Sequence, residues 1–324
     1  MHNIALEKEK RRQRIEKRKR KRRKKMLQRA AIMIIGVLFI SGIGRMVINI
    51  FITENKSVEV MTNDKVDEQS TSEIAEKIEV MTRDDMSKGN LVVVNDTYPL
   101  RNYENIELVT IKDHNEELYR VSSSQLKLQK EALEAFNLMI KDFTEEVEKH
   151  NLQIISGYRS FDEQEKLHYE SLLVNTEKNN NTLVAKPDRS DYHTGLVVDL
   201  GLYYADDTNG KYDGSGIYSW ITDYCYKYGF IITDNKQPGH LRYIGNVHAG
   251  LMKELNLGFD EYIEYIESYR YYANPYQSKE GAGQGYSIYY VPATGDKTQV
   301  PVPVSKKYSI SGNNKDGFII TVTL

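Results

Sequence analysis

Three short stretches of the chain hold the residues that could do chemistry. They read S-G-Y-R-S from Ser156 to Ser160, S-D-Y-H-T-G-L-V-V-D from Ser190 to Asp199, and Q-P-G-H-L-R-Y from Gln237 to Tyr243. Within 88 residues, their side chains include the imidazoles of His193 and His240, the carboxylate of Asp199 and the guanidinium of Arg159. Imidazole and carboxylate are zinc ligands, and a guanidinium fork suits the two oxygens of a substrate carboxylate. The pattern therefore predicts a site of the zinc-peptidase kind.

The charges of the 324-residue chain are divided unevenly. Residues 1–29 hold 15 Lys and Arg against three Glu, a local net charge of +12, whereas the whole chain is formally −2. The remainder is therefore near −14. An acidic body repels phosphate, so the basic run does not indicate nucleic-acid binding and we expect no nucleic-acid partner. The run instead resembles the cytoplasmic flank of a membrane segment.

Residues 30–52 form an apolar segment that follows the basic run directly. Twenty-three helical residues, at about 1.5 Å each, reach roughly 34 Å, enough to cross a bilayer core of about 30 Å. We expect a single membrane span at the cell membrane, with the tail of residues 1–29 in the cytoplasm and the main domain outside. A cleaved signal peptide, with Gly42-x-Gly44 as the cleavage site, is the alternative. Residues 53–88 are polar and acidic and predict a stalk.

Hydrophobic periodicity and turn residues predict an α+β domain over residues 89–275, with a mainly antiparallel sheet flanked by helices. Its expected strands cover 91–94, 152–156, 196–200, 230–233 and 241–244, and its expected helices cover 126–150, 162–173, 218–228, 247–255 and 260–272. Residues 276–324 predict a small β appendix that packs on this domain or forms a hairpin module beside it. Cys225 is the only cysteine, which excludes an intramolecular disulfide, and its apolar helical surroundings predict a buried thiol.

Together, these stretches resemble the VanY-type D-alanyl-D-alanine carboxypeptidases, zinc enzymes that remove the terminal D-alanine from peptidoglycan stem peptides. The likeness covers roughly residues 91–272. It implies the zinc D,D-carboxypeptidase fold, stem peptides as the substrate class, and zinc as the cofactor if the protein is active. It also implies Asp199 and His240 as zinc ligands and Arg159 as the anchor for the terminal carboxylate, with Ser160 and Gln164 close to that anchor.

Two positions depart from the family pattern Ser-x-His-x-x-Gly-x-x-x-Asp and its later glutamate. Tyr192 stands at the first histidine ligand, and His193 comes one residue late. Side chains of an extended segment alternate faces, so His193 should point away from the metal unless a bulge compensates. Gln237 stands at the catalytic glutamate, and an amide cannot take a proton from zinc-bound water. We also considered His248 as a replacement ligand.

Two functional hypotheses therefore stay open. The first is a membrane-anchored, extracytoplasmic D,D-carboxypeptidase that holds zinc with Asp199, His240 and a displaced His193. The second is a metal-free pseudopeptidase that binds cell-wall stem peptides or a protein partner. The structural alternatives are an ordinary hydrogen-bonded role for His193, an ion pair within the loop for Arg159, and an aromatic filling the metal position for Tyr192.

Overall fold

The computed structural model describes residues 75–100, 106–115, 117–147, 150–178, 184–234, 236–270, 276–277 and 285–324. They belong to one compact unit that spans residues 72–324. The expected cytoplasmic tail, the membrane span and most of the stalk lie outside the described residues. Within the described ranges, no helix is both long enough and apolar enough to cross a membrane.

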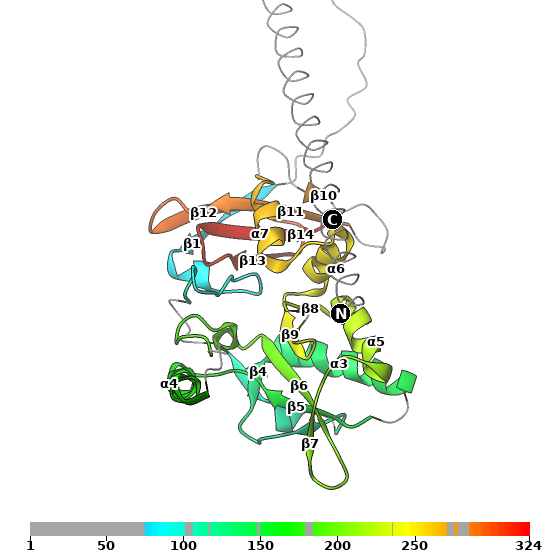
Figure 1. Cartoon of the computed structure of the whole chain (residues 1–324). Helices are drawn as coiled ribbons and strands as arrows, with labels where there is room; N and C mark the ends of the chain where they lie inside the picture. The colour runs from blue at the N-terminus through cyan, green and yellow to red at the C-terminus, as the bar shows by residue number, and fades with distance from the viewer. Residues whose placement is uncertain are drawn as a thin grey trace, which may run out of the picture. The chain divides into compact units, whose positions relative to one another are not determined.

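The main sheet has six strands in the order β3-β5-β6-β9-β8, with β7 paired to β6 (Figure 1). These strands are β3 (Arg120–Val121), β5 (Leu152–Ser156), β6 (Val197–Tyr203), β7 (Asn209–Lys211), β8 (Phe230–Ile232) and β9 (His240–Tyr243). Only β3 and β5 pair in parallel; the other pairs of this sheet are antiparallel. The predicted mainly antiparallel sheet is therefore confirmed.

The helix α3 (Lys130–Val147) covers this sheet with an amphipathic face. Its buried residues recur every three or four positions, namely Ala132, Leu133, Phe136, Met139, Ile140 and Phe143. The predicted helix over 126–150 starts too early, because Lys127–Gln129 form β4, which pairs with β2 (Leu108–Thr110). A short helix, α2 (Ile111–His114), follows β2.

The remaining helices are α4 (Phe161–Lys178), α5 (Ser219–Tyr224), α6 (Asn246–Leu255) and α7 (Phe259–Glu267). The predicted helix over 218–228 is an α-helix only in its centre, because 3-10 turns cover Gly216–Tyr218 and Cys225–Tyr228. Gly229 ends the second turn with φ 85°, a conformation that glycine adopts without strain. Cys225 is buried, and burial raises the pKa of its thiol to about 12, so it is an inert core residue.

The C-terminal strands form a second sheet in the order β10-β11-β14-β13. They are β10 (Tyr276–Gln277), β11 (Tyr286–Pro292), β13 (Tyr308–Gly312) and β14 (Gly317–Thr323). Ile288, Tyr290 and Ile319 share a hydrophobic core with buried residues of α6 and α7. A separate core joins Phe318 and Ile320 to β12 (Lys297–Pro303). The appendix thus packs on the main domain, and Figure 1 shows α6 and α7 beside it.

Two expectations for residues 76–94 are wrong. Residues 76–82, expected in the stalk, form β1 (Glu76–Thr82), which pairs with β12 along its whole length, and Asp84–Ser87 form a 3-10 turn, η1. The apolar run 91–94 forms no strand. Val93 N–H donates to Asn313 O, and Leu91 N–H donates to the Ser311 hydroxyl. These hydrogen bonds hold the segment 91–94 against the β appendix.

Candidate functional site

Three neighbouring strands set the position of the site. Asp199 on β6 lies opposite His240 on β9 and opposite Ser156 on β5. The register of β5 shifts between Ile154 and Ser156, a bulge of the kind that redirects side chains beside active sites. Gly157 follows, and only glycine fits there, because a Cβ would lie 2.6 Å from the carbonyl oxygen of Lys127. This close approach lets Tyr158 N–H donate to the carbonyl oxygen of Lys127 and fixes the start of the Arg159 loop on β4.

A 3-10 turn, η2 (Asp191–Thr194), brings the central motif onto this sheet edge. Gly195 ends the turn with φ 67° and donates its N–H to the carbonyl of Tyr192. Tyr192 Oη then lies 2.5 Å from Asp199 Oδ2 and 3.2 Å from His240 Nδ1. Burial, followed by the charge of Asp199, raises the pKa of Tyr192 well above its usual value. The residue is therefore a neutral phenol that donates a hydrogen bond to Asp199.

His240 lies between two carboxylates. Its Nδ1 is 2.9 Å from Asp199 Oδ1, and its Nε2 is 3.1 Å from Asp191 Oδ2. Burial alone would lower the pKa of the imidazole, but the hydrogen bonds to Asp191 and Asp199 outweigh it and raise the pKa to about 10. Burial likewise opposes ionisation of Asp191, yet its bond to His240 holds the pKa of that carboxyl below its usual range. At neutral pH, His240 is an imidazolium that donates from both nitrogens.

These residues do not fit a zinc ion as they stand. The Tyr192 oxygen, the two Asp199 oxygens and His240 Nδ1 lie close together: Tyr192 Oη is 2.5 Å from Asp199 Oδ2 and 3.2 Å from His240 Nδ1, and Nδ1 is 2.9 Å from Asp199 Oδ1. Bonds of about 2.1 Å to a tetrahedral zinc would hold such atoms roughly 3.4 Å apart. Among the described residues, no group of three or more His, Cys, Asp and Glu side chains is arranged to hold a metal ion. A hydrogen-bonded cluster fills the place that the resemblance gives to zinc.

His193 does not join this cluster. It is fully buried; its Nδ1 donates to the carbonyl of Arg159 at 2.8 Å, and its Nε2 accepts from Asp188 N–H at 3.3 Å. Burial lowers the pKa of the imidazole, which matches a neutral ring with one donor and one acceptor nitrogen. The expectation that His193 is a displaced zinc ligand is therefore wrong. Its hydrogen bond to the Arg159 carbonyl connects the Arg159 loop to the turn η2.

Arg159 carries an unbalanced charge at the cleft. Its Nη2 donates to Ser156 Oγ at 3.0 Å and its Nη1 to Gln164 Oε1 at 3.4 Å, and both partners are neutral. The guanidinium lies 3.6 Å from the centre of the Tyr192 ring. In the described ranges it forms no ion pair, so the alternative of a structural ion pair does not apply. This geometry leaves the guanidinium charge available to an anionic ligand.

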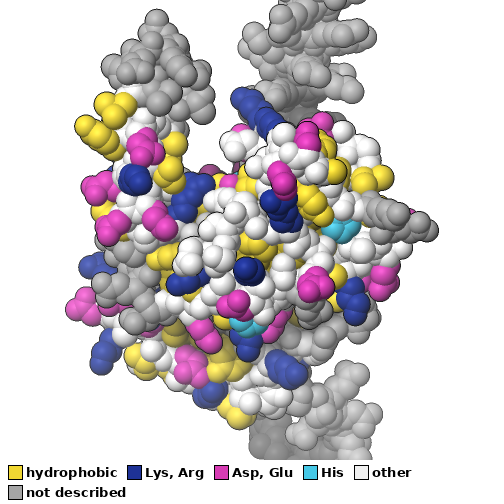
Figure 2. All heavy atoms as spheres, turned by 90° about the horizontal axis from the view of Figure 1, so that it is seen from below, with side chains coloured by type: hydrophobic (Ala, Val, Ile, Leu, Met, Phe, Trp, Pro, Cys, Tyr) yellow, Lys and Arg dark blue, Asp and Glu magenta, His cyan; other side chains and the backbone are white. Residues whose placement is uncertain are grey.

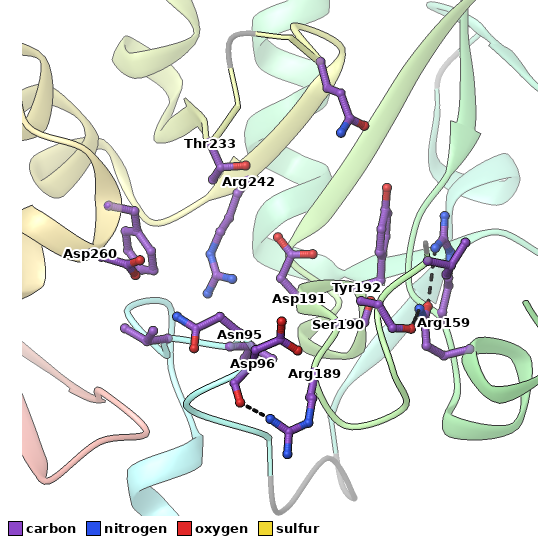
Figure 3. Close-up of a pocket in the computed structure, with 17 residues that line it drawn as sticks. Asn95, Asp96, Arg159, Arg189, Ser190, Asp191, Tyr192, Thr233, Arg242 and Asp260 are labelled. Atoms are coloured by element: carbon purple, nitrogen blue, oxygen red, sulfur yellow. Dashed lines mark hydrogen bonds between the residues drawn. The ribbon is translucent and has the colours of Figure 1, made fainter. Parts of the chain in front are cut away.

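The cleft that Arg159 lines has a volume of about 680 Å³ (Figure 3). Gln164 and Gln237 line it as well; the first is fully buried and donates to Ala185 O, whereas the second is exposed. Ser160 is not among the lining residues. It exchanges hydrogen bonds with Glu163 at the start of α4, a capping box, which gives it a structural role.

Asp191, Arg242 and Asp260 also line this cleft, and none of them stood out from the sequence. One signal was present: His240 and Arg242 are two residues apart on β9, so their side chains share a face of the sheet. His248, considered as a replacement ligand, lies elsewhere. Its ring bonds the hydroxyls of Tyr262 and Thr321 in the packing between the helices and the C-terminal sheet.

A family model and two curated relatives agree with the resemblance to D-alanyl-D-alanine carboxypeptidases. Residues 125–246 match the family model described as "VanY: D-alanyl-D-alanine carboxypeptidase". A D-alanyl-D-alanine carboxypeptidase of Enterococcus faecium is 30% identical over 305 residues, covering 88% of this chain and 93% of that protein. The putative carboxypeptidase YodJ of Bacillus subtilis (strain 168) is 31% identical over 189 residues, covering 55% of this chain and 68% of that protein.

A solved structure extends this likeness to the fold. The vancomycin resistance D,D-dipeptidase VanXYg, in complex with a D-Ala-D-Ala phosphinate analogue, matches with a TM-score of 0.66 and 29% identity. The match covers 77% of this chain and all of that one. The similarity therefore reaches well beyond the residues of the family model. The chain belongs to the VanY-type D-alanyl-D-alanine carboxypeptidase family.

Proposed function

We propose that the protein binds the D-alanine end of peptidoglycan stem peptides in the cleft over Arg159 and does not hydrolyse them through zinc. The observation that carries this proposal is the Arg159 guanidinium, which lines the cleft and has only neutral hydrogen-bond partners. A peptide carboxylate supplies the two oxygens that such a fork binds best. Two relatives support the choice of peptide: one is named a D-alanyl-D-alanine carboxypeptidase, and the other holds a D-Ala-D-Ala phosphinate analogue.

The same site supports binding over hydrolysis. Tyr192, Asp199 and His240 are bonded to one another in a way that does not fit zinc, and Gln237 offers no group that takes up a proton. General-base catalysis needs a side chain that accepts a proton from the attacking water. Hydrolysis by the family pattern would need a histidine at position 192 and a glutamate at position 237, and this chain has neither.

Arg159→Gln is expected to weaken binding of a synthetic peptide that ends in D-Ala-D-Ala. Losing a charge-assisted hydrogen-bond pair costs about 1.5–3 kcal/mol, which corresponds to a roughly 10- to 100-fold rise in Kd. Isothermal titration calorimetry of residues 53–324 measures the Kd of each variant. Arg120→Gln serves as the matched control, because Arg120 is an exposed arginine that pairs with Asp207 away from the cleft. Equal affinity of Arg159→Gln and the wild type would remove the basis of the proposal, and zinc-dependent release of D-alanine by the wild type would show hydrolysis.

We also propose that residues 30–52 anchor the protein in the cell membrane, with residues 1–29 in the cytoplasm and the binding domain outside. The apolar length and the adjoining basic run support this arrangement. The full chain should stay with membranes after an alkaline carbonate wash, whereas residues 53–324 should not bind them. Release of the full chain by carbonate would contradict the span, and a mature N-terminus just after Gly44 would show the signal-peptide alternative.

A further inference from the structure

The strand β1 keeps an open edge. It pairs with β12 along one side, and no strand among the described residues pairs with its other side. Every residue of β1 is at least partly exposed. On one face, the apolar side chains of Ile78 and Val80 are more than half exposed. Such an edge presents unpaired N–H and C=O groups to any extended chain that reaches it.

The hydrogen bonds to β12 determine which backbone groups of β1 point outward. At the two ends of the ladder, Val304 N–H donates to Ala75 O, and Arg83 N–H donates to Asp296 O. Antiparallel strands alternate between bonded and non-bonded pairs, so the odd-numbered residues of β1 bond β12. The backbone groups that point to the open edge are therefore those of the even-numbered residues, Glu76, Ile78, Val80 and Thr82.

The far edge of β12 is blocked, in contrast to the open edge of β1. The same alternation turns the backbone of Pro301 and Pro303 away from β1 and toward that far edge. Proline has no N–H to give to a neighbouring strand. The carbonyl of Pro301 also accepts a hydrogen bond from the Tyr289 hydroxyl. The sequence of β1 contains no proline, so its edge is the one on which another strand can pair.

The charges of β1 are complementary to themselves in one antiparallel register. When Ile78 lies opposite the Ile78 of a second copy, Lys77 of each strand lies opposite Glu79 of the other. Both charged side chains are accessible, and they would occupy non-bonded pairs, where opposing side chains come closest. In the neighbouring register, with Ile78 opposite Val80, Glu79 would face Glu79. Like charges directly opposite one another are destabilising, so charge selects the first register.

The hydrogen-bonding groups at the open edge select the same register. It joins Ile78 to Ile78 and Glu76 to Val80 on each side, which is three bonded pairs and about six hydrogen bonds. The neighbouring register would also need the N–H of Thr82. That group is already used, because it donates to Asp85 Oδ2 at 2.8 Å.

We propose that two copies of this chain associate through β1 and form an antiparallel sheet in the order β12-β1-β1-β12, with Ile78 on the two-fold axis. The interface is isologous, because the same strand supplies both halves of each ion pair. By contrast, the face seen from below in Figure 2 mixes acidic, basic and apolar side chains without a field of one kind, and it indicates no partner. No residue of β1 lines the cleft, so this inference is independent of the proposed function.

Cysteine cross-linking of the full chain tests the register. On oxidation with copper phenanthroline, Ile78→Cys should form a disulfide between two copies, because Cα atoms of a bonded antiparallel pair lie about 5.5 Å apart. Glu79→Cys and Gln299→Cys should give at least about fivefold less dimer, since their Cα atoms would lie beyond the roughly 7 Å limit of a disulfide. Gln299 is the matched control, because it is exposed on β12 opposite Val80. The native Cys225 is buried and should not react. A stronger dimer band from Glu79→Cys than from Ile78→Cys, or no dimer from either, would overturn the proposal.

Charge exchange on the Ile78→Cys background tests the ion pairs. Lys77→Glu would oppose two pairs of glutamates, and Glu79→Lys two pairs of lysines, so each variant alone should lower the cross-linked dimer by at least about fivefold. Co-expression of the two variants should restore the dimer, because a mixed pair has both ion pairs again. The double variant Lys77→Glu with Glu79→Lys keeps the ion pair within its own strand and should cross-link like the parent, which separates lost pairing from lost folding. Equal cross-linking of all these chains, or a double variant that folds but does not cross-link, would contradict the proposal.

Discussion

Replacing Tyr192 by histidine together with Gln237 by glutamate is expected to give a protein that holds about one zinc ion per chain, where the wild type holds none. In the wild type, the Tyr192 hydroxyl lies 2.5 Å from Asp199 and 3.2 Å from His240, so it fills the space between the two side chains. An imidazole is shorter than a phenol and brings a neutral nitrogen ligand. With Asp199 and His240, it completes the three protein ligands that catalytic zinc sites use.

The second substitution, Gln237→Glu, supplies the proton acceptor that hydrolysis needs in addition to zinc. A carboxylate at position 237 would stand where the family pattern has its proton acceptor, and Gln237 already lines the cleft. The double variant should therefore release D-alanine from a peptide ending in D-Ala-D-Ala, and Tyr192→His alone should bind zinc without comparable activity. Elemental mass spectrometry of protein purified without chelator or a His-tag measures the metal, and a D-alanine assay measures the reaction.

Two controls make the result readable. Tyr192→Phe removes the hydroxyl without adding a ligand, so it should bind no zinc although it frees Asp199 and His240 from the phenol. The same mass spectrometry on the wild type tests whether that protein is free of zinc. One zinc per chain in the wild type would show that the Tyr192 side chain moves aside and lets the metal bind. A well-folded double variant without zinc would show that Tyr192 is not at the family's ligand position.

Much of the site followed from local rules that act over a few residues. The one-residue offset predicted that His193 would point away from Asp199, and its ring does lie against the Arg159 backbone. The reason differs from the expected one, because residues 191–194 form a 3-10 turn and not the extended segment that alternation requires. Four strands of the main sheet, β5, β6, β8 and β9, were predicted because each contains a short apolar run, whereas β3 and β7 were not predicted. Arg159 was singled out as the guanidinium of the stretch Ser156 to Ser160, and its role came from the family resemblance.

The rest of the site depends on contacts that no local pattern encodes. The bond between His240 and Asp191 joins residues 49 positions apart, and its effect on the imidazole depends on burial by both segments. Arg242 reads as an ordinary strand residue. Its exceptional state arises because the carbonyl of Val92 and the ring of Phe259, from distant segments, close over it and leave its Nε without a partner.

The strand β1 shows the same limit in the fold, for a different reason. Its apolar residues Ile78 and Val80 are 51% and 55% exposed, whereas the polar Lys77 and Glu79 lie on the other face. Glu79 accepts a hydrogen bond from Tyr308 at 2.7 Å and pairs with Lys77 at 2.7 Å. The usual rule that apolar residues face inward is reversed here, and the pairing partner β12 comes more than 200 residues later. The segment therefore resembles a solvated stalk in the sequence.

Removing residues 1–88 is expected to destabilise the protein markedly, whereas removing residues 1–74 is not. The longer deletion takes away β1, its ladder to β12 and the 3-10 turn η1. It also removes the bonds from Gly312 N–H to Lys88 O and from Asn314 N–H to Met86 O. Each lost hydrogen bond is worth about 0.5–1.5 kcal/mol net, so the total is several kcal/mol. For a domain of this size, about 2–4 °C per kcal/mol gives a fall in Tm of roughly 10 °C or more.

Thermal unfolding followed by near-ultraviolet circular dichroism compares three chains that begin at residues 53, 75 and 89. The first two should unfold at the same temperature, and the third should unfold earlier, with β12 open to proteolysis. The physical reason is that β12 pairs with β1. Loss of β1 therefore leaves the edge of β12 unpaired, next to the core that contains Val300 and Val302. If the chain from residue 89 unfolded at the same temperature as the other two, β1 would contribute nothing to stability. The domain would then start at residue 89, where the sequence pattern placed it.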